Sequence, residues 1–307
     1  MSWETDEGPK LRNTFDQAAN FFEVGQIIDT KRVGGNANKN YVVTTDQGDY
    51  VFKLIIEHPR KDLEDEIQFL ERLAQYNFPA SYYQKSPQGN SIYESNGDLI
   101  VSMPKLNGEN PTLSPEVCAA IGQNIAKLHT IPSENLPNRN HWLRQTYLED
   151  TISKVEKEFP DEAKKIRAEQ ETLKSFNYQE LPMGIVHGDM SASNCLFVNN
   201  QLTAMLDWEE VGIAPVVLDL ATCILNLCYQ DNKLNPELYQ KILESYQTVR
   251  PLSSLEKTSL ASAMKYAGLT LSVWRLAQFG IHHPDPEKIK DYEDYWKMNL
   301  DTLQLPS

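Results

Sequence analysis

Two carboxylates and one carboxamide lie at the ends of short apolar runs in the middle of this chain. Asp189 comes after Ile185 and Val186, Asn194 comes five residues later, and Asp207 ends the run 202–206. Phosphoryl transfer from a nucleotide needs one carboxylate to orient the accepting hydroxyl. It also needs a second carboxylate and a neutral oxygen to hold Mg²⁺ on the phosphates. The spacing of these residues supplies all three groups and therefore predicts a kinase-type phosphotransferase.

Two further polar residues lie close to this set in the sequence. His187 is compatible with a metal-dependent hydrolase, which stays an alternative class, but no second histidine-rich motif accompanies it. We expect His187 to bond to the backbone near Asp189 instead. Asp219 lies in an apolar run, where a carboxylate must be hydrogen-bonded. We expect it to cap a helix and to hold the segment around Asp189 from behind.

A glycine-containing loop lies between two expected strands in the first part of the chain. It includes Gly34, Gly35 and Asn38. Small residues there would let backbone amides approach phosphate oxygens, although such a turn taken alone is usually only a hairpin loop. No Gly-Lys-Ser/Thr follows, so the loop is not of the P-loop type. The sequence thus predicts a phosphate-covering loop at this position.

One lysine and one glutamate follow that loop. Lys53 is flanked by strand hydrophobes, so its side chain either faces solvent or reaches a buried anion. Its position one hairpin after the loop resembles the strand lysine that pairs nucleotide phosphates with a helix glutamate. Glu66 is the preferred partner and Glu64 the competitor, because a spacing of two residues puts them on different faces of a helix.

The elements that position these residues divide the chain into two parts. A change of composition near 103–108 predicts domains 1–103 and 104–307. The first should be a small antiparallel β-lobe with one helix, and the second a mostly helical lobe whose only β element is a hairpin at 185–207. Strands are expected at 23–33, 39–45, 50–56, 91–93 and 99–103; helices are expected at 62–76, 115–129, 140–159, 161–176, 218–230, 236–249 and 253–279, with a last one opening at Asp285 and Pro286.

Composition narrows the classes of partner. A net charge of −14 argues against binding to nucleic acid or to an anionic membrane surface, and it would suit a cationic or zwitterionic substrate. The amino terminus lacks the features of a signal peptide, and no apolar run is long enough to span a bilayer. The four cysteines lie in apolar surroundings without metal-site spacing, which favours reduced thiols and a cytoplasmic location.

Taken together, the motifs resemble a known family. His-Gly-Asp at 187–189, Asn194, Asp-Trp-Glu at 207–209 and Asp-Leu-Ala at 219–221 occur in this order. This set is similar to that of the aminoglycoside phosphotransferase superfamily, which includes choline and ethanolamine kinases. Some segments resemble the homoserine kinase-like branch: the form of the 35–41 loop, Asp219-Leu-Ala-Thr-Cys, and the segments 246–252 and 272–276. Two other motifs, His-Gly-Asp and Asp-Trp-Glu, are as in the antibiotic and choline kinases.

The resemblance implies a two-lobed, protein-kinase-like α+β fold with the nucleotide in its cleft, and ATP and Mg²⁺ as cofactors. The acceptor would be a small amine-bearing alcohol, with homoserine or a related amino alcohol preferred over an aminoglycoside, choline or ethanolamine. A protein kinase or nucleotide-binding pseudokinase is an alternative class. The protein would be a monomer or a homodimer, and it would bind neither nucleic acid nor a membrane. The implied roles are Asp189 as base; Asn194, Asp207 and Glu209 at the metal; Gly34, Gly35, Asn38, Lys53, Glu66 and Met103 at the nucleotide; and Arg275 as a possible carboxylate clamp.

Overall fold

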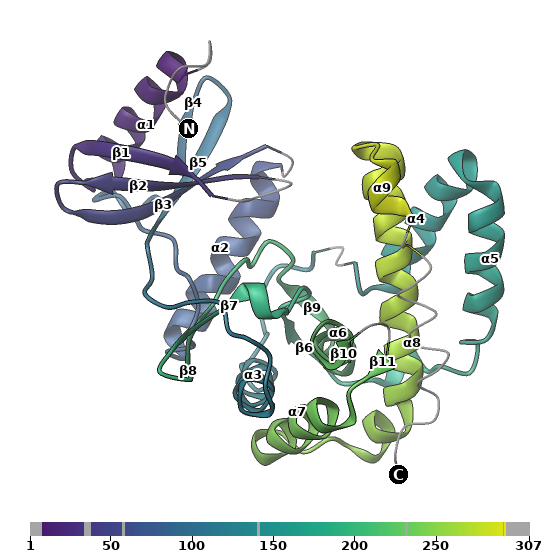
Figure 1. Cartoon of the computed structure of the whole chain (residues 1–307). Helices are drawn as coiled ribbons and strands as arrows, with labels where there is room; N and C mark the ends of the chain where they lie inside the picture. Colours follow the sequence, from purple (N-terminus) through teal and green to yellow (C-terminus); the bar gives the residue numbers. More distant parts are fainter. Residues whose placement is uncertain are drawn as a thin grey trace. The chain divides into compact units, whose positions relative to one another are not determined.

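The computed structural model describes residues 8–33, 38–56, 59–139, 142–230, 233–290 and 292. The chain divides into two compact units, Met1–Gly108 and Glu109–Ser307 (Figure 1). The functions expected of the two parts, nucleotide binding and acceptor binding, stay predictions.

The first unit is built on a five-stranded antiparallel sheet with the strand order β1-β2-β3-β5-β4. Consecutive strands pair except where α2 and a long connection separate β3 from β4, so β5 lies next to β3 (Figure 1). The elements are α1 (Gly8–Phe22), β1 (Ile27–Arg32), β2 (Lys39–Thr45), β3 (Gly48–Ile55), α2 (Arg60–Gln75), β4 (Tyr93–Ser95) and β5 (Asp98–Pro104).

The two faces of this sheet carry separate apolar cores. On one face Phe15 of α1 meets Phe52 of β3 edge-to-face, with ring centroids 5.6 Å apart. On the other, Leu63 of α2 packs with Ile55 and Val101. Because successive side chains of a strand point to opposite faces, even-numbered residues of β3 face α1 and odd-numbered ones face α2. This alternation decides where Lys53 points.

Helix α1 corrects the expectation of a β-lobe with a single helix. Its apolar residues Phe15, Ala18, Ala19 and Phe22 recur at helical spacing and are buried. The helix has no acidic residue in its first turn and no basic residue in its last, so the usual charge signals at helix ends are missing. Burial of the apolar stripe against the sheet stabilises this helix.

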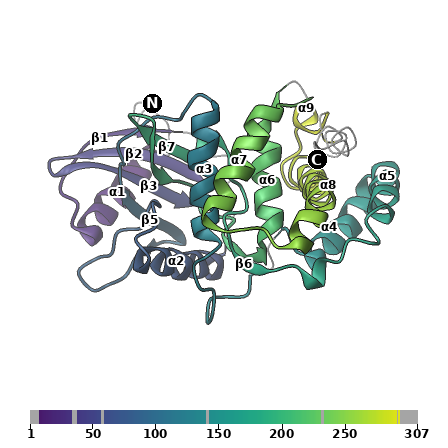
Figure 2. The same cartoon turned by 90° about the horizontal axis from the view of Figure 1, so that it is seen from below.

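The second unit is mainly helical, as expected. Helix α3 packs along α7, and α6 packs along α8 (Figure 2). The hydroxyl of Ser114 caps the helix that begins at Pro115 by accepting from the backbone of Val117, and Ser253 and Glu256 form a capping box at the start of the helix that begins at Ser254. The helices are α3 (Pro115–Leu128), α4 (Gln145–Glu158), α5 (Pro160–Glu171), α6 (Val216–Cys228), α7 (Pro236–Val249), α8 (Ser254–Leu276) and α9 (Pro286–Ile289), and a π-helical turn, Ala277–His282, follows α8.

The expectation of one hairpin as the only β element of this unit is wrong. Strand β6 (Met183–Val186) pairs with β9 (Gly212–Pro215), and β7 (Cys195–Val198) pairs with β8 (Gln201–Met205); the short pair β10 (Tyr229–Gln230) and β11 (Lys233–Leu234) adds a third ladder. Strand β9 has four residues and runs directly into α6, which leaves too short a stretch for a period-two pattern to be recognised.

Within the described ranges, none of the helices has the length and apolar character that a membrane span requires.

Candidate active site

The loop that carries Asp189 connects β6 to β7, and we refer to it as the 187–194 loop. Its turn is made at Gly188, whose φ of 86° lies in the left-handed region that glycine adopts without steric cost. Asp189 follows directly. A short 3₁₀ turn, Ala192–Asn194, then leads into β7.

Strand pairing brings Asn194 and Asp207 to the same place. Cys195 pairs with Met205 at the end of the β7–β8 ladder, and the backbone N–H of Leu206 donates to the carbonyl of Asn194 at 2.8 Å. Asp207 comes next, with a φ of 60°. A non-glycine residue held in this conformation stores strain, which is commonest at functional sites.

Asn194 is also tied to Asp189. Its amide nitrogen donates to the Asp189 carbonyl at 2.8 Å and lies 3.3 Å from carboxylate Oδ2. With the nitrogen used in this way, the amide oxygen of Asn194 is turned away from Asp189 and is available to a cation. The three residues singled out by spacing in the sequence thus gather at one end of the β7–β8 ladder.

The electrostatic surroundings favour a proton-accepting role for Asp189. Desolvation by the packed protein is the largest effect, the nearby carboxylate of Asp207 adds to it, and together they raise the pKa of Asp189 to about 6 despite the hydrogen bond from Asn194. An aspartate with an elevated pKa beside other carboxylates is typical of catalytic and metal-binding sites. A cation bound among these carboxylates would relieve the repulsion.

Asp219 holds the 187–194 loop from behind, as predicted. The expectation that it caps a helix is wrong, because the N-cap residue of α6 is Pro215 and Asp219 lies inside the first turn. Its Oδ2 accepts from the backbone N–H of His187 at 3.0 Å, and its Oδ1 accepts from that of Gly188 at 2.8 Å. The structural role expected of His187 is confirmed as well, because its Nε2 lies 2.9 Å from the carbonyl oxygen of Leu206. Its ring also packs against the buried Trp208, with centroids 4.6 Å apart.

Two asparagines that sequence reasoning missed also hold this region. Asn110 donates to the carbonyls of Ser193 and Cys195 at 2.7 and 3.0 Å, and Asn226 of α6 donates to the carbonyl of Met190 at 3.1 Å. Both are distant in sequence from their partners and belong to no local motif, so only the fold reveals them.

In the first unit, Lys53 and Glu66 have the burial that a phosphate clamp requires. Lys53 has an odd number on β3 and therefore faces α2, and both side chains are 5% exposed. The hydroxyl of Tyr83 donates to Glu66 at 2.5 Å. Glu64 instead pairs at the surface with Arg60 at 2.8 Å. The pairing of Lys53 with Glu66 on nucleotide phosphates stays a prediction.

The other residues expected at the nucleotide have mixed positions. Gly34 and Gly35 lie outside the described residues. The side chain of Asn38 is buried and accepts from the backbone of Ile56 at 2.8 Å. Met103 lies on β5, opposite Val51. Nucleotide contacts by these four candidates stay predictions.

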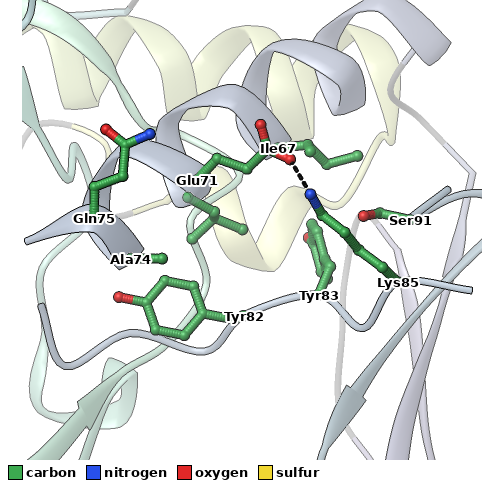
Figure 3. A pocket seen from close by; sticks show the side chains of 9 residues that line it. Ile67, Glu71, Ala74, Gln75, Tyr82, Tyr83, Lys85 and Ser91 are labelled. Atoms are coloured by element: carbon green, nitrogen blue, oxygen red, sulfur yellow. Dashed lines mark hydrogen bonds and ion pairs between the residues drawn. The ribbon is translucent and has the colours of Figure 1, made fainter. Parts of the chain in front are cut away.

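A pocket of about 540 Å³ lies beside α2 in the same unit. Figure 3 shows residues of α2 along one side of it and Tyr82, Tyr83 and Lys85 along the other, and the ion pair between Glu71 and Lys85, 2.6 Å long, connects the two sides. The residues that line it include none of those predicted to contact nucleotide. One connection to them is the hydrogen bond from the Tyr83 hydroxyl to Glu66.

The oxygen donors near Asp189 suit a hard divalent cation. Mg²⁺ is usually held by one or two carboxylates together with substrate phosphates and water, and Asp207 with the amide oxygen of Asn194 matches that pattern. Among the residues that the structure describes, no three His, Cys, Asp or Glu side chains form a metal-binding group by themselves. Direct ligation by Glu209 therefore stays a prediction.

Arg275 has a structural contact in this unit. Its Nε donates to the carbonyl of Lys288, and its guanidinium lies 5.6 Å from the ring centroid of Phe279. These contacts connect α8 to the segment that contains α9. Its alternative role as a clamp for a substrate carboxylate stays a prediction.

Comparison with known proteins identifies the family. Residues 29–253 match the phosphotransferase enzyme family. A homoserine kinase of Polaromonas naphthalenivorans is 27% identical over 293 residues, which are 91% of this chain and 92% of that protein. Solved structures of similar fold include an amicoumacin kinase in complex with AMP-PNP and Ca²⁺, with a TM-score of 0.77, 15% identity, and coverage of 98% of this chain and 97% of that one. A microcompartment-associated aminopropanol kinase has a TM-score of 0.68 at 15% identity, covering 95% and 97%.

The expected protein-kinase-like fold is confirmed by these structural neighbours. The chain therefore belongs to the phosphotransferase enzyme family, in its homoserine kinase-like branch, and is a small-molecule phosphotransferase that acts on a hydroxyl group.

Proposed function

We propose that this protein transfers the γ-phosphoryl group of ATP, with Mg²⁺, to the hydroxyl of homoserine or a closely related amino alcohol. The observation that carries the proposal is the grouping of Asp189, Asn194 and Asp207 at the end of one β-ladder. Similarity to homoserine kinases along nine-tenths of the chain supports this acceptor.

In this proposal Asp189 orients the acceptor hydroxyl and takes its proton as the oxygen attacks phosphorus. The raised pKa of its carboxyl group brings the proton affinity of Asp189 closer to the value that a general base needs near neutral pH. Asn194 fixes Asp189 through the two contacts to its carbonyl and carboxylate. Such positioning is the main contribution that a protein makes to phosphoryl transfer.

Asn194 and Asp207 would hold Mg²⁺ through oxygen atoms, and the bound ion would neutralise charge on the transferred phosphoryl group. Lys53 would bind nucleotide phosphates, supported by Glu66. The Tyr83 hydroxyl fixes the carboxylate of Glu66 on α2, so this glutamate is held in one orientation before nucleotide binds.

A net charge of −14 is compatible with an acceptor that carries an ammonium group, since acidic surfaces attract cationic ligands. This charge does not discriminate between amino alcohols. Homoserine is preferred because of the sequence relatives, whereas the aminopropanol kinase shares the fold at much lower identity.

The proposal is tested by measuring ADP release with ATP and Mg²⁺ against homoserine, choline, ethanolamine, 1-amino-2-propanol and an aminoglycoside. We expect homoserine to raise the rate far above the rate without acceptor. Asp189→Asn should abolish this increase while nucleotide binding persists, and Asp207→Asn should raise the Mg²⁺ concentration needed for half-maximal rate. Equal rates with and without every acceptor would contradict the proposal.

A further inference from the structure

A row of buried polar side chains extends from Asp219 away from the 187–194 loop. His129 Nε2 lies 3.0 Å from Asp219 Oδ2, and His129 Nδ1 lies 2.7 Å from the Tyr246 hydroxyl. Arg250 Nη1 reaches that hydroxyl at 3.1 Å and Glu256 Oε1 at 2.8 Å. We call these five residues the buried relay.

The relay connects four helices of the second unit at their ends. Asp219 lies in the first turn of α6, His129 is the C-cap residue of α3, and Tyr246 is in the last turn of α7. Arg250 is the C-cap residue of α7, and Glu256 belongs to the capping box of α8. The relay thus runs from the start of α8 to the backbone before Asp189.

Its members are nearly inaccessible to water. The side chains of His129 and Asp219 are 0% exposed, and Tyr246 is 0% exposed. Arg250 retains 17% exposure and its partner Glu256 only 1%. Buried polar groups of this kind are costly unless every donor has an acceptor, so the direction of each hydrogen bond is constrained.

The guanidinium group of Arg250 fixes the direction of each hydrogen bond in the relay. Arginine can only donate, so the oxygen of Tyr246 accepts from Arg250 and its O–H is directed to His129 Nδ1. His129 then carries its proton on Nε2 and donates to Asp219. The opposite tautomer would leave the tyrosine O–H without an acceptor and would point the Nε2 lone pair at a carboxylate.

The charge states agree with this pattern. Burial is the largest influence on His129 and lowers its pKa despite the neighbouring Asp219, so the ring is neutral. Burial alone would raise the pKa of Asp219, but the contacts with His129 and with the backbone of His187 outweigh it and hold the pKa below its usual value. A neutral histidine therefore donates to an ionised aspartate.

We propose that Tyr246 and Arg250 are positioning residues for Asp189, because their hydrogen bonds hold the ring of His129 and thereby the carboxylate of Asp219 that holds the 187–194 loop. This inference rests on the proposed function for its kinetic consequence. Asp189 directly follows Gly188, whose N–H is one of the loop's bonds to Asp219. A small displacement of a group that orients the nucleophile lowers the rate with little effect on nucleotide binding.

Tyr246→Phe tests the relay by removing one oxygen and leaving the ring. Nδ1 of His129 then loses its hydrogen bond and Asp219 alone holds the ring, so kcat should fall about tenfold, the effect of one buried hydrogen bond. The KM for nucleotide should change less than twofold. Tyr239→Phe is the matched control, because Tyr239 is buried on the same helix but lies outside the relay, and its kcat should be unchanged.

The tautomer is read by long-range ¹H–¹⁵N correlation spectra of the histidine rings. This readout needs no catalytic activity, so it distinguishes a failure of the relay from a failure of the proposed function. An Nδ1-protonated His129 in the wild type would overturn the inference, as would an unchanged kcat in a folded Tyr246→Phe variant whose Nδ1 signal shows the loss of its hydrogen bond. If Tyr246→Phe does not fold, Arg250→Met should lower kcat, and Arg250→Lys, which can still donate, should recover part of it. Equal kcat values for these two variants and the wild type would also overturn it.

Discussion

Replacement of Asp219 by asparagine removes one charge at a site where three donors converge. Oδ2 accepts from His129 Nε2 and the backbone of His187, both at 3.0 Å, and Oδ1 accepts from the backbone of Gly188 at 2.8 Å. An asparagine that places its oxygen at the Oδ2 position must turn its NH₂ group toward the N–H of Gly188. Two donors then face each other in the protein interior, where Asp219 is 0% exposed.

The cost follows from these contacts. The bond to Gly188 is lost, which as a bond to a charged group contributes about 1.5–3 kcal/mol, and a buried N–H is left unpaired at about 1–3 kcal/mol. The two remaining bonds weaken because neutral acceptors bind about half as strongly as charged ones. We expect Asp219→Asn to lower the free energy of unfolding of the second unit by about 3–5 kcal/mol.

Urea unfolding followed by tryptophan fluorescence measures this loss, since four of the five tryptophans lie beyond residue 108. Asp150→Asn is the control: Asp150 is exposed on α4, and its replacement should change the free energy by less than about 0.5 kcal/mol. A loss for Asp219→Asn as small as that of the control would refute the assignment of this carboxylate as the anchor of the 187–194 loop.

Three further predictions follow from the structure. Gly122→Ala should destabilise the second unit by about 1–3 kcal/mol in urea unfolding, because its Cβ would lie 2.7 Å from a backbone carbonyl of α7; a gain from helix propensity alone would contradict this. Tyr83→Phe should weaken nucleotide binding about three- to tenfold by calorimetry, since Glu66 loses its donor; unchanged affinity would argue against a role for Glu66. Burial lowers the pKa values of His129 and His187, so below pH 6.5 the unfolded chain binds more protons than the folded chain. The free energy of unfolding should therefore fall on acidification, with a slope of up to about 1.4 kcal/mol per pH unit for each histidine. A free energy of unfolding that rises from pH 7 to 5.5 would contradict the neutral state of both rings.

Much of the site could be predicted because its signals are local. Asp189 and Asp207 come shortly after β6 and β8, Asn194 comes directly before β7, and strand pairing between β7 and β8 is sufficient to bring Asn194 and Asp207 together. The burial of Glu66 rather than Glu64 follows from helical periodicity on α2. In each case the relevant neighbours are only a few residues away.

The remaining features depend on contacts between distant segments. Helix α1 lacks charge signals at its ends and is held by its apolar stripe. Strand β9 has four residues and pairs with β6, which is distant in sequence. Asn110 and Asn226 bond to backbone carbonyls about 85 and 36 positions away, and the link from His129 to Tyr246 spans 117. Such interactions leave no periodic pattern from which sequence reasoning could start.

The most direct test of the central claim is ³¹P NMR of the reaction with homoserine, ATP and Mg²⁺. The account predicts a new phosphomonoester signal that grows as the γ-phosphate signal of ATP decays, and no such signal with the Asp189→Asn variant. Inorganic phosphate as the only product, or a phosphomonoester formed equally well by Asp189→Asn, would contradict it.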